Sequence, residues 1–388
     1  MRSARFAGLV LLGLACLPGV RAGAEEPAIK IGYFGGLSGR NGASSTKALR
    51  AIELALQEAQ KSGWNGSRRI QILRYDNESN PARNITLFER AKKDGVQAIT
   101  GVHISNDGLL IARLAESSRI PMVVASATNP EISAGMKYVV QVCFTDDVQG
   151  RVLGDFALKR LKAKSIAVIE DVADQASATV AEEFSTYVSK NPDVLLRRWS
   201  IRTGNQDFTR LSKELGAGPR PELVFISASS IESAFVIRQL QKDGLRFVYL
   251  GTDNWQNQDF RQLLSKLGVT GIQSFFPGHW HLGLDRPAAR RLIREYRSTY
   301  SEALSDFDAD AALAYDAASL LLSSIREALK AAPSVREPDV DAVMEAIRKR
   351  TLDGATGEVS FDSSGKPRKT LHMLELNGRG VMSLGEFK

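Results

Sequence analysis

The chain has 388 residues, of which 43% are hydrophobic and 24% are charged. This composition excludes a wholly disordered chain and a collagen-like or coiled-coil rod, and the length favours two domains. The formal net charge is +7, but no Lys/Arg tract of the kind that follows a phosphate backbone occurs. The sequence therefore predicts no nucleic-acid partner.

Residues 1–24 have the features of a secretory signal peptide. Arg2 and Arg5 precede a short apolar stretch, and Ala22-Gly23-Ala24 has the small-x-small pattern that signal peptidase reads. We therefore expect export to the periplasm. Two alternatives stay open. One is an uncleaved anchor, although the apolar stretch falls short of the roughly 20 residues that a span needs. The other is lipid attachment at Cys16.

Short β-rich runs alternate with amphipathic helical patterns along the rest of the chain. We expect strands at 29–34, 70–75, 96–101 and 122–125, with helices between them and one at 106–118. The pattern restarts with a strand at 165–170, a helix at 176–189 and strands at 194–201, 222–227 and 247–250. Such alternation requires right-handed crossovers and parallel sheets covered on both faces, so the sequence predicts an α/β protein with two doubly wound units.

The last 100 residues do not begin a third domain. Helices are expected near 286–302 and 308–330, followed by a turn plus a strand within 354–361 and a last strand at 371–376. These pieces are too few to close a core of their own, so they complete the two earlier units, and the chain crosses between those units more than once.

Cleavage of the signal peptide would remove Cys16 and leave Cys143 as the one cysteine of the chain. Cys143 lies within an apolar run, so we interpret it as a small buried hydrophobic residue.

The motifs of the common enzyme classes are missing. The spacing of Gly35, Gly36, Gly39 and Gly42 fits no dinucleotide loop, and neither a P-loop nor a G-x-S-x-G elbow occurs. We therefore predict no enzyme and no cofactor. A metal site built from His103, His279 and His281 is an alternative, but no H-E-x-x-H or acidic cluster accompanies them, so we predict no metal.

A series of short motifs in a fixed order carries a resemblance. The motifs are Ile31-Gly32, Leu37-Ser38-Gly39, Asn80-Pro81, Asp94-Gly95-Val96, Ala127-Thr128-Asn129-Pro130-Glu131, Gln149-Gly150, Tyr315-Asp316-Ala317 and Gly354-Ala355-Thr356-Gly357. With these, residues 28–388 resemble the type I periplasmic binding proteins, in particular the leucine/isoleucine/valine-binding-like substrate-binding proteins of ABC transporters.

The resemblance implies two parallel-sheet lobes joined by a hinge of three crossings, with the ligand between the lobes. We expect the crossings near 145–150, 272–282 and 352–360. One lobe then holds 28–146 plus 280–352, and the other holds 147–279 plus 353–388.

The implied function is that of a monomeric, non-enzymatic receptor in the periplasm. It would capture a small polar ligand, amino-acid-like or related, and deliver it to ABC transporter permease subunits in the inner membrane. The same fold also serves as a sensor of amides or metabolites, and the sequence leaves that alternative open.

Four candidate ligand contacts follow from matching positions. Ser105 matches the family's Ser that holds a ligand carboxylate, Ser126 and Thr128 match the loop that offers a carbonyl and a hydroxyl, and Asp253 matches an acidic residue that faces the ligand ammonium. The alternative roles are a helix N-cap for Ser105 and a turn residue for Asp253.

Three positions depart from the amino-acid binders of the family. Gln175-Ala176 stands where they carry Tyr-Gly, Ser229 stands near a second pocket Tyr, and Ser44 replaces an aromatic residue. We count Gln175 and Ser229 as ligand contacts, and Trp255 as an aromatic that refills the pocket, with a place in the core as its alternative. Because the aromatic walls are missing, the amino-acid specificity is not carried over.

Overall fold

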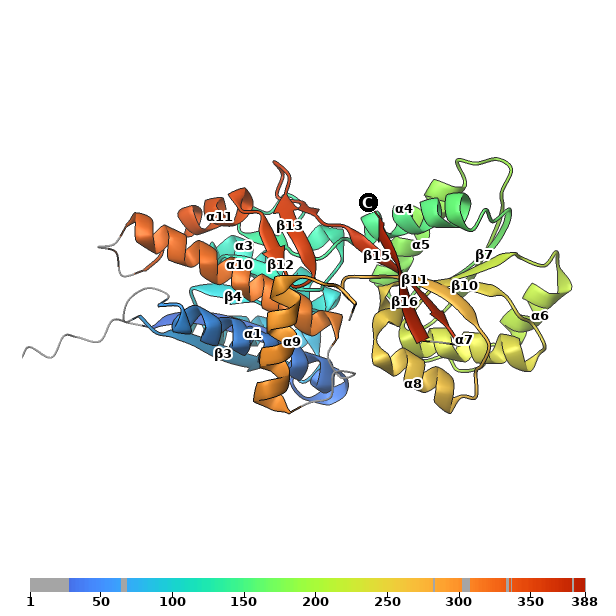
Figure 1. The fold of residues 1–388 in the computed structure, drawn as a ribbon, viewed down its shortest axis with the longest axis horizontal. Helices are drawn as coiled ribbons and strands as arrows, with labels where there is room; N and C mark the ends of the chain where they lie inside the picture. Colours follow the sequence, from blue (N-terminus) through green and yellow to red (C-terminus); the bar gives the residue numbers. More distant parts are fainter. Residues whose placement is uncertain are drawn as a thin grey trace, which may run out of the picture.

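The computed structural model describes residues 28–63, 68–281, 283–301, 308–332, 335, 337–378 and 380–387. The expected signal peptide and Cys16 lie outside this range. Two lobes lie side by side along the long axis of the molecule, each built around its own sheet (Figure 1). The predicted fold class, two α/β lobes with parallel sheets, is confirmed.

The first lobe has a five-stranded sheet in the order β3-β1-β4-β5-β6, with all neighbouring strands parallel. The strands are β1 (Ile29–Gly35), β3 (Ile70–Asp76), β4 (Ala98–Thr100), β5 (Met122–Val124) and β6 (Val139–Gln141). Its helices are α1 (Gly42–Lys61), α2 (Asn84–Lys93), α3 (Ser105–Ser118), α9 (Pro287–Tyr300), α10 (Ala309–Ala331) and α11 (Val340–Lys349).

The second lobe has a seven-stranded sheet in the order β16-β15-β11-β10-β9-β7-β8. The strands are β7 (Ser165–Asp171), β8 (Leu195–Ile201), β9 (Leu223–Ser227), β10 (Val248–Gly251), β11 (Gln273–Gly278), β15 (Leu371–Asn377) and β16 (Gly380–Phe387). Its helices are α4 (Asp146–Asp155), α5 (Gln175–Val188), α6 (Thr209–Ala217), α7 (Ser230–Lys242) and α8 (Gln258–Lys266).

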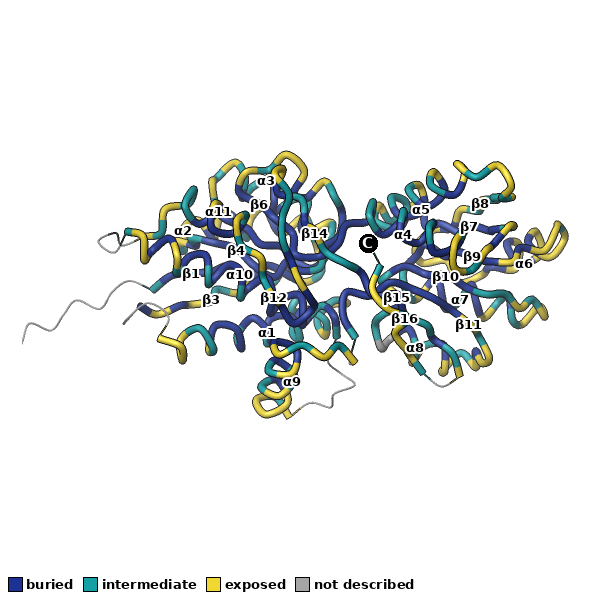
Figure 2. The backbone as a smooth tube through the Cα atoms, turned by 45° about the horizontal axis from the view of Figure 1, so that its top comes forward, coloured by how far each residue is buried: buried dark blue, intermediate teal, exposed yellow. Residues whose placement is uncertain are grey.

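Helices cover both faces of each sheet, as the continuous apolar strands require. In the first lobe, α1, α9, α10 and α11 share one core, while α2 and α3 share the core on the opposite face. In the second lobe, α6, α7 and α8 cover one face, and α4 and α5 cover the other. Figure 2 shows the central strands buried inside, whereas exposed residues lie on the outer faces of the helices, in the loops and along the edge strands β8 and β16. Cys143 is fully buried, as predicted, and burial raises the pKa of its thiol.

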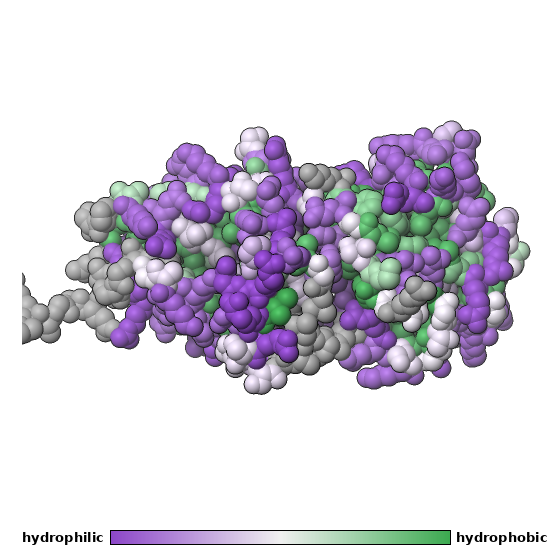
Figure 3. Space-filling view, in the orientation of Figure 1, coloured by the Kyte–Doolittle hydropathy of each residue, from purple (hydrophilic) through white to green (hydrophobic). Residues whose placement is uncertain are grey.

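The edge of the second sheet departs from the purely parallel arrangement. β11 pairs with β15 in the antiparallel sense, and so does β15 with β16. Only two residues separate β15 from β16, and such a short link allows an antiparallel hairpin but no parallel crossover. Figure 3 shows a mostly hydrophilic first lobe, whereas hydrophobic side chains gather on the second lobe around these strands. Val381 and Met382 of β16 are among the exposed hydrophobic residues.

Three chain segments connect the lobes: between β6 and α4, between β11 and α9, and between β14 and β15. The third lies later than the sequence suggested. The small sheet of β12 (Leu352–Gly354), β13 (Gly357–Phe361) and β14 (Pro367–Arg368) precedes it, and Ala355 and Val359 pack in the core of the first lobe. We therefore assign residues 353–368 to the first lobe and correct the boundary expected at 353.

Asp316 of α10 explains why this small sheet stays with the first lobe. Its buried carboxylate accepts hydrogen bonds from the N–H groups of Ala355 (2.6 Å) and Thr356 (2.8 Å), and from the Thr356 hydroxyl (2.6 Å). Gly354 makes the approach possible, because a Cβ there would lie 2.5 Å from the Asp316 Oδ2. The turn between β12 and β13 is thus fixed to α10, and the chain leaves the first lobe only afterwards.

Candidate functional site: a cleft between the lobes

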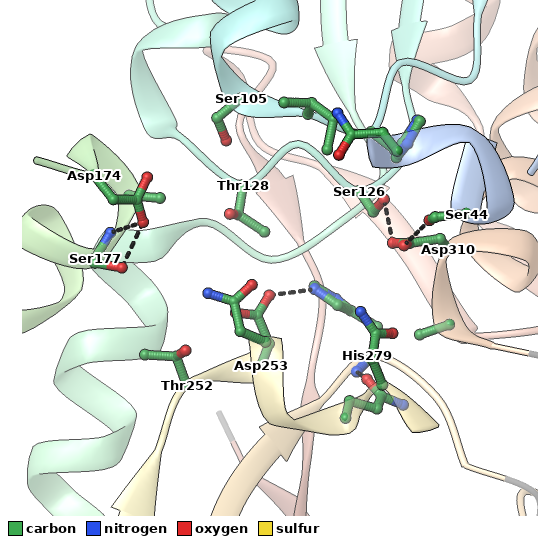
Figure 4. A pocket seen from close by; sticks show the side chains of 18 of the residues that line it. Ser44, Ser105, Ser126, Thr128, Asp174, Ser177, Thr252, Asp253, His279 and Asp310 are labelled. Carbon is green, nitrogen blue, oxygen red and sulfur yellow. Dashed lines mark hydrogen bonds and ion pairs between the residues drawn. The ribbon is translucent and has the colours of Figure 1, made fainter. Parts of the chain in front are cut away.

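A cleft of about 390 Å³ lies between the lobes, where the carboxyl ends of strands from both sheets meet. The first lobe contributes residues near the starts of α1, α3 and α10, together with the loop after β5. The second lobe contributes the start of α5 and the segment 252–257, while Asp146 and His279 come from two of the crossings. Figure 4 shows labelled side chains of both lobes, together with His279, around one space.

The lining is polar. Among the described residues of the cleft, the apolar ones are small or aliphatic, and no aromatic ring is included: Ala43, Ile104, Ala176, Val180 and Ala309. A hydrophobic ligand would find little apolar surface to cover, and apolar contact contributes only about 25 cal/mol per Å². The cleft is therefore suited to a ligand that forms hydrogen bonds.

Two serines and an aspartate form a cluster on the wall of the first lobe. Ser44 in α1 and Ser126 after β5 donate hydrogen bonds to the two carboxylate oxygens of Asp310, at 2.8 and 2.7 Å. Asp310 belongs to the first turn of α10, and Figure 4 shows both bonds. The hydroxyls hold this carboxylate in one orientation at the cleft wall.

The loop after β4 brings His103 and Ser105 to the same wall. Ser105 is the first residue of α3, and no side chain caps that helix, so its first N–H groups are available to a ligand. The Nε2 of buried His103 lies 3.2 Å from the Ser45 hydroxyl, whereas its Nδ1 has no hydrogen-bond partner in the described structure. Both residues line the cleft.

Asp253 lies at the floor of the cleft, in the turn after β10, and its neighbours fix its orientation. The Gln149 amide donates to its carboxylate (3.2 Å) and accepts from its backbone N–H (3.0 Å). The His279 Nε2 lies 3.2 Å from the other carboxylate oxygen, and the His279 ring stacks on Phe144 with centroids 3.6 Å apart. Burial lowers the pKa of His279, an effect that Asp253 opposes.

Asp146 opens α4 at the first crossing and is the most unusual acidic residue of the cleft. Its side chain is buried, and its Oδ2 has no hydrogen-bond partner among the described residues. Burial raises the pKa of Asp146 well above its ordinary value, and the nearby Asp253 carboxylate raises it further. The free protein therefore disfavours the charged form of this residue.

The structure brings together four of the seven expected contacts. Ser105, Ser126, Thr128 and Asp253 line the cleft. Their position follows from the sequence, because each comes shortly after a strand whose carboxyl end faces the other lobe.

The other three expected residues do not line the cleft. Gln175 is exposed, and its neighbours Asp174, Ala176 and Ser177 face the cleft in its place. Ser229 caps α7 by accepting from the N–H of Ile231. Trp255 is fully buried in the core of the second lobe, where its ring stacks on Phe260 at 4.6 Å.

Close packing beneath Trp255 explains its direction. A Cβ at Gly251 would lie 2.1 Å from the Trp255 ring, so the absence of a side chain there leaves the indole room over the end of β10. The ring thus turns into the core, away from the ligand space.

Sequence reasoning missed Asp146, Asp310 and Arg40 as cleft residues. Asp146 could have been found, because it follows the apolar run that ends at Phe144. Asp310 carried no local signal, since its partner Ser44 is 266 residues away.

The histidines do not assemble into a metal site. His279 contacts Asp253, whereas the ring of His281 packs edge-on against His372 with centroids 5.0 Å apart. Within the described part of the chain, no group of three or more His, Cys, Asp or Glu side chains is arranged to hold a metal ion. Nor does any described helix have the length and apolar character needed to cross a bilayer.

Comparison with known proteins agrees with this architecture. A family described as periplasmic binding protein matches residues 28–380. The chain belongs to the periplasmic binding protein family.

Relatives of this periplasmic binding protein include amino-acid receptors. A leucine-, isoleucine-, valine-, threonine- and alanine-binding protein from Pseudomonas aeruginosa is 24% identical over 339 residues, which cover 87% of this chain and 86% of the relative. A Leu/Ile/Val-binding protein homolog from Brucella melitensis is 22% identical over 346 residues, covering 89% and 90%. These relatives are binding proteins and not enzymes.

Solved structures show the same fold. A leucine-binding protein from Thermotoga maritima superposes with a TM-score of 0.81 at 26% identity, covering 93% of this chain and 99% of the other. A solute-binding protein of an ABC transporter from R. palustris, in complex with benzoate, gives a TM-score of 0.77 at 19% identity, covering 92% and 96%.

Proposed function

We propose that this protein is an exported receptor that captures a small polar solute between its lobes and delivers it to an ABC importer without altering it. One observation carries the proposal. Four residues that line the cleft, from both lobes and the crossings, each carry a buried polar atom with no hydrogen-bond partner among the described residues: His103 Nδ1, Asp146 Oδ2, Thr252 Oγ1 and His279 Nδ1. Buried polar groups are normally paired, so these atoms are available to a bound solute.

A solute that pairs with these atoms stabilises the closed arrangement of the lobes. Only the closed form can offer His103 from one lobe and Thr252 from the other to the same molecule, so the ligand binds that form more tightly. Closure is then the signal that the permease recognises. No nucleophile or metal is needed, which agrees with the binding proteins among the relatives.

The walls of the cleft argue against simple transfer of the relatives' ligands. The relatives' names specify branched-chain and other amino acids, and the R. palustris protein holds benzoate. Here the described lining lacks Phe, Tyr and Trp and carries several carboxylates, so we infer a more polar solute. The named relatives and structures are binding proteins, and no observation favours the sensor alternative.

Small-angle scattering with a library of polar solutes tests the proposal. We expect the radius of gyration to fall, and the melting temperature to rise, with at least one solute at saturating concentration. Asp253→Asn should abolish the compaction, whereas Asp193→Asn, which removes the same charge from an exposed loop, should preserve it. A library in which no solute compacts the wild type would contradict the proposal.

Export is tested separately. When the full chain is expressed with its N-terminal segment, the mature protein should appear in the periplasmic fraction with Glu25 as its first residue. A mature chain that retains the first 24 residues would contradict this part.

A further inference from the structure

The charge around the cleft is strongly unbalanced. Its lining contains four carboxylates, Asp146, Asp174, Asp253 and Asp310, against the single cationic side chain of Arg40 among the described residues. Arg40 is exposed, so it does not neutralise the interior of the cleft. A zwitterionic or neutral solute would leave this imbalance in place.

The open oxygen of Asp146 shows where a positive group is missing. The residue is 1% exposed and lines the cleft, yet its Oδ2 has no partner among the described residues. Asp146 lies at the start of α4, where the helix dipole partly stabilises the negative charge of its carboxylate. The negative charge of the neighbouring Asp253 destabilises that charge. A cation bound beside both carboxylates would offset the repulsion between Asp146 and Asp253.

Neighbouring residues fix the Asp253 carboxylate in place. Gln149 holds both its backbone and its carboxylate, and His279 contacts the second oxygen. This carboxylate therefore cannot rotate away from Asp146 without losing those bonds. Each carboxylate oxygen also has capacity for a further donor, so the pair can accept several N–H groups from one ligand.

A second acidic position lies across the cleft. Asp310 is oriented by Ser44 and Ser126, and in the view of Figure 4 the His279 ring lies between Asp253 and Asp310. The charge of Asp310 also acts on His279, as does that of Asp253. Burial keeps His279 neutral, so it separates the two acidic positions without adding a positive charge of its own.

We propose that the solute is a small organic molecule with two cationic nitrogen groups, one bound between Asp146 and Asp253 and the other at Asp310. This inference rests on the proposed receptor function and specifies its ligand. The shared chemistry is that of a linear diamine or amino-guanidine, which occurs either free or within a basic amino acid. In a basic amino acid the carboxylate would meet the free N–H groups at Ser105.

Isothermal titration calorimetry on the wild-type protein tests the ligand class. The panel contains 1,4-diaminobutane, agmatine, arginine and lysine, with n-butylamine, leucine and benzoate as comparisons. We expect at least one dicationic compound to bind more than about tenfold tighter than n-butylamine, which carries only one charge. Tightest binding by arginine or lysine identifies the basic amino acid, and tightest binding by the first two compounds identifies the free diamine.

Variants locate the cation. Asp146→Asn keeps the size of the side chain and removes its charge, so it should weaken binding of the preferred dication by about 10- to 100-fold. Asp193→Asn should change the affinity by less than about twofold, because its side chain lies in an exposed loop. Equal binding by wild type and Asp146→Asn would overturn the proposed position.

The pH dependence gives a readout that does not depend on a folded variant. The charged and titratable groups that act on Asp146 are Asp253, Asp174 and Asp147, and the Cys143 thiol lies nearby. None of these supplies a positive charge, and burial raises the pKa of Asp146, so a cation bound beside its carboxylate favours loss of the proton. Affinity for the dication should therefore rise with pH, with release of a proton on binding, and a pH-independent affinity would contradict the inference.

The outcomes separate this inference from the proposed function. Compaction and tight binding with leucine, benzoate or another uncharged or anionic solute, while all dications fail, would overturn the ligand class and leave the receptor function standing. Failure of every solute to compact the protein would overturn both.

Discussion

Asp316 and Asp146 are two buried carboxylates near the crossings between the lobes, and they differ in what surrounds them. Asp316 accepts three hydrogen bonds from the turn at Ala355 and Thr356, and the buried Lys369 ammonium lies close enough to affect it. Asp146 has an open oxygen and an acidic neighbour, Asp253. The first environment is complete without a ligand, whereas the second is completed only by one.

The comparison distinguishes an acidic residue that stabilises the fold, Asp316, from one that we propose binds the ligand, Asp146. The exposed fraction of the side chain does not distinguish them. Both side chains are almost fully buried, and burial raises the pKa of both. The distinguishing observation is how fully the donors satisfy each carboxylate: Asp316 accepts three hydrogen bonds, whereas Asp146 is paired with Thr128 and its Oδ2 has no partner among the described residues.

The largest expected effect comes from removing the structural acid. Asp316→Ala leaves two buried N–H groups of the β12–β13 turn without their acceptor and removes the negative charge that acts on the buried Lys369 ammonium, so the free energy of unfolding should fall by about 3–5 kcal/mol. Urea denaturation followed by circular dichroism measures it. A loss below about 1 kcal/mol would remove the distinction drawn between the two residues.

His372, which lies in β15 directly after the third crossing, is a buried basic residue that can be compared with these two buried acids. Burial, together with the positive charges of His281 and Lys369, lowers the pKa of His372 to about 4. The folded protein therefore takes up this proton less readily than the unfolded chain does. The free energy of unfolding should accordingly fall as the pH drops from about 6.5 to 4, by about 3 kcal/mol for this group.

The variant His372→Gln isolates that contribution. Its unfolding free energy should change less between pH 6.5 and 4 than that of the wild type, in urea titrations at each pH. Identical slopes for the two proteins would show that His372 is protonated as easily in the folded state as in the unfolded chain.

Asp146→Asn should have a smaller effect of the opposite sign in the ligand-free protein. Because the folded state raises the pKa of Asp146, its ionisation at high pH opposes folding. The variant should be more stable than the wild type at pH 8, and the difference should shrink toward pH 4. Thermal melts across this range measure it, with Asp193→Asn as the control. A variant that is less stable at every pH would place Asp146 in the same class as Asp316.

The smallest effect concerns a residue that the sequence assigned to the ligand and the structure turns away. Ser229→Ala removes the cap of α7, so the protein should lose about 1 kcal/mol of stability. Its affinity for the solute should stay within about twofold of the wild type. Isothermal titration calorimetry measures the affinity, and a large loss of affinity would indicate that Ser229 contacts the ligand after all.

Much of the fold could be predicted because local patterns specified it. The expected strands at 29–34 and 165–170 are observed as β1 and β7, and the expected helix at 308–330 is observed as α10. β11, α11 and β16 were not predicted. β16 pairs as an edge strand with β15, and such a strand is exposed along much of its length, so its hydrophobic pattern is weak.

The candidate site was predictable only where a residue follows a strand directly. Ser105 and Thr128 reach the cleft because the sheet directs the end of each strand toward the other lobe. Trp255 was misplaced because the direction of a side chain in a short turn depends on packing, here over Gly251. Asp310 depends on contacts across more than 180 residues of sequence, which no local pattern reveals.

The ends of the described chain belong to different lobes. β1 begins at Ile29 in the first lobe, and β16 ends at Phe387 in the second, beyond the last crossing. A donor fluorophore attached near one end and an acceptor near the other would therefore be carried by separate rigid bodies. Energy transfer between them would change with the angle between the lobes, so the third crossing, which leaves the two ends on different lobes, gives a practical basis for a solute biosensor.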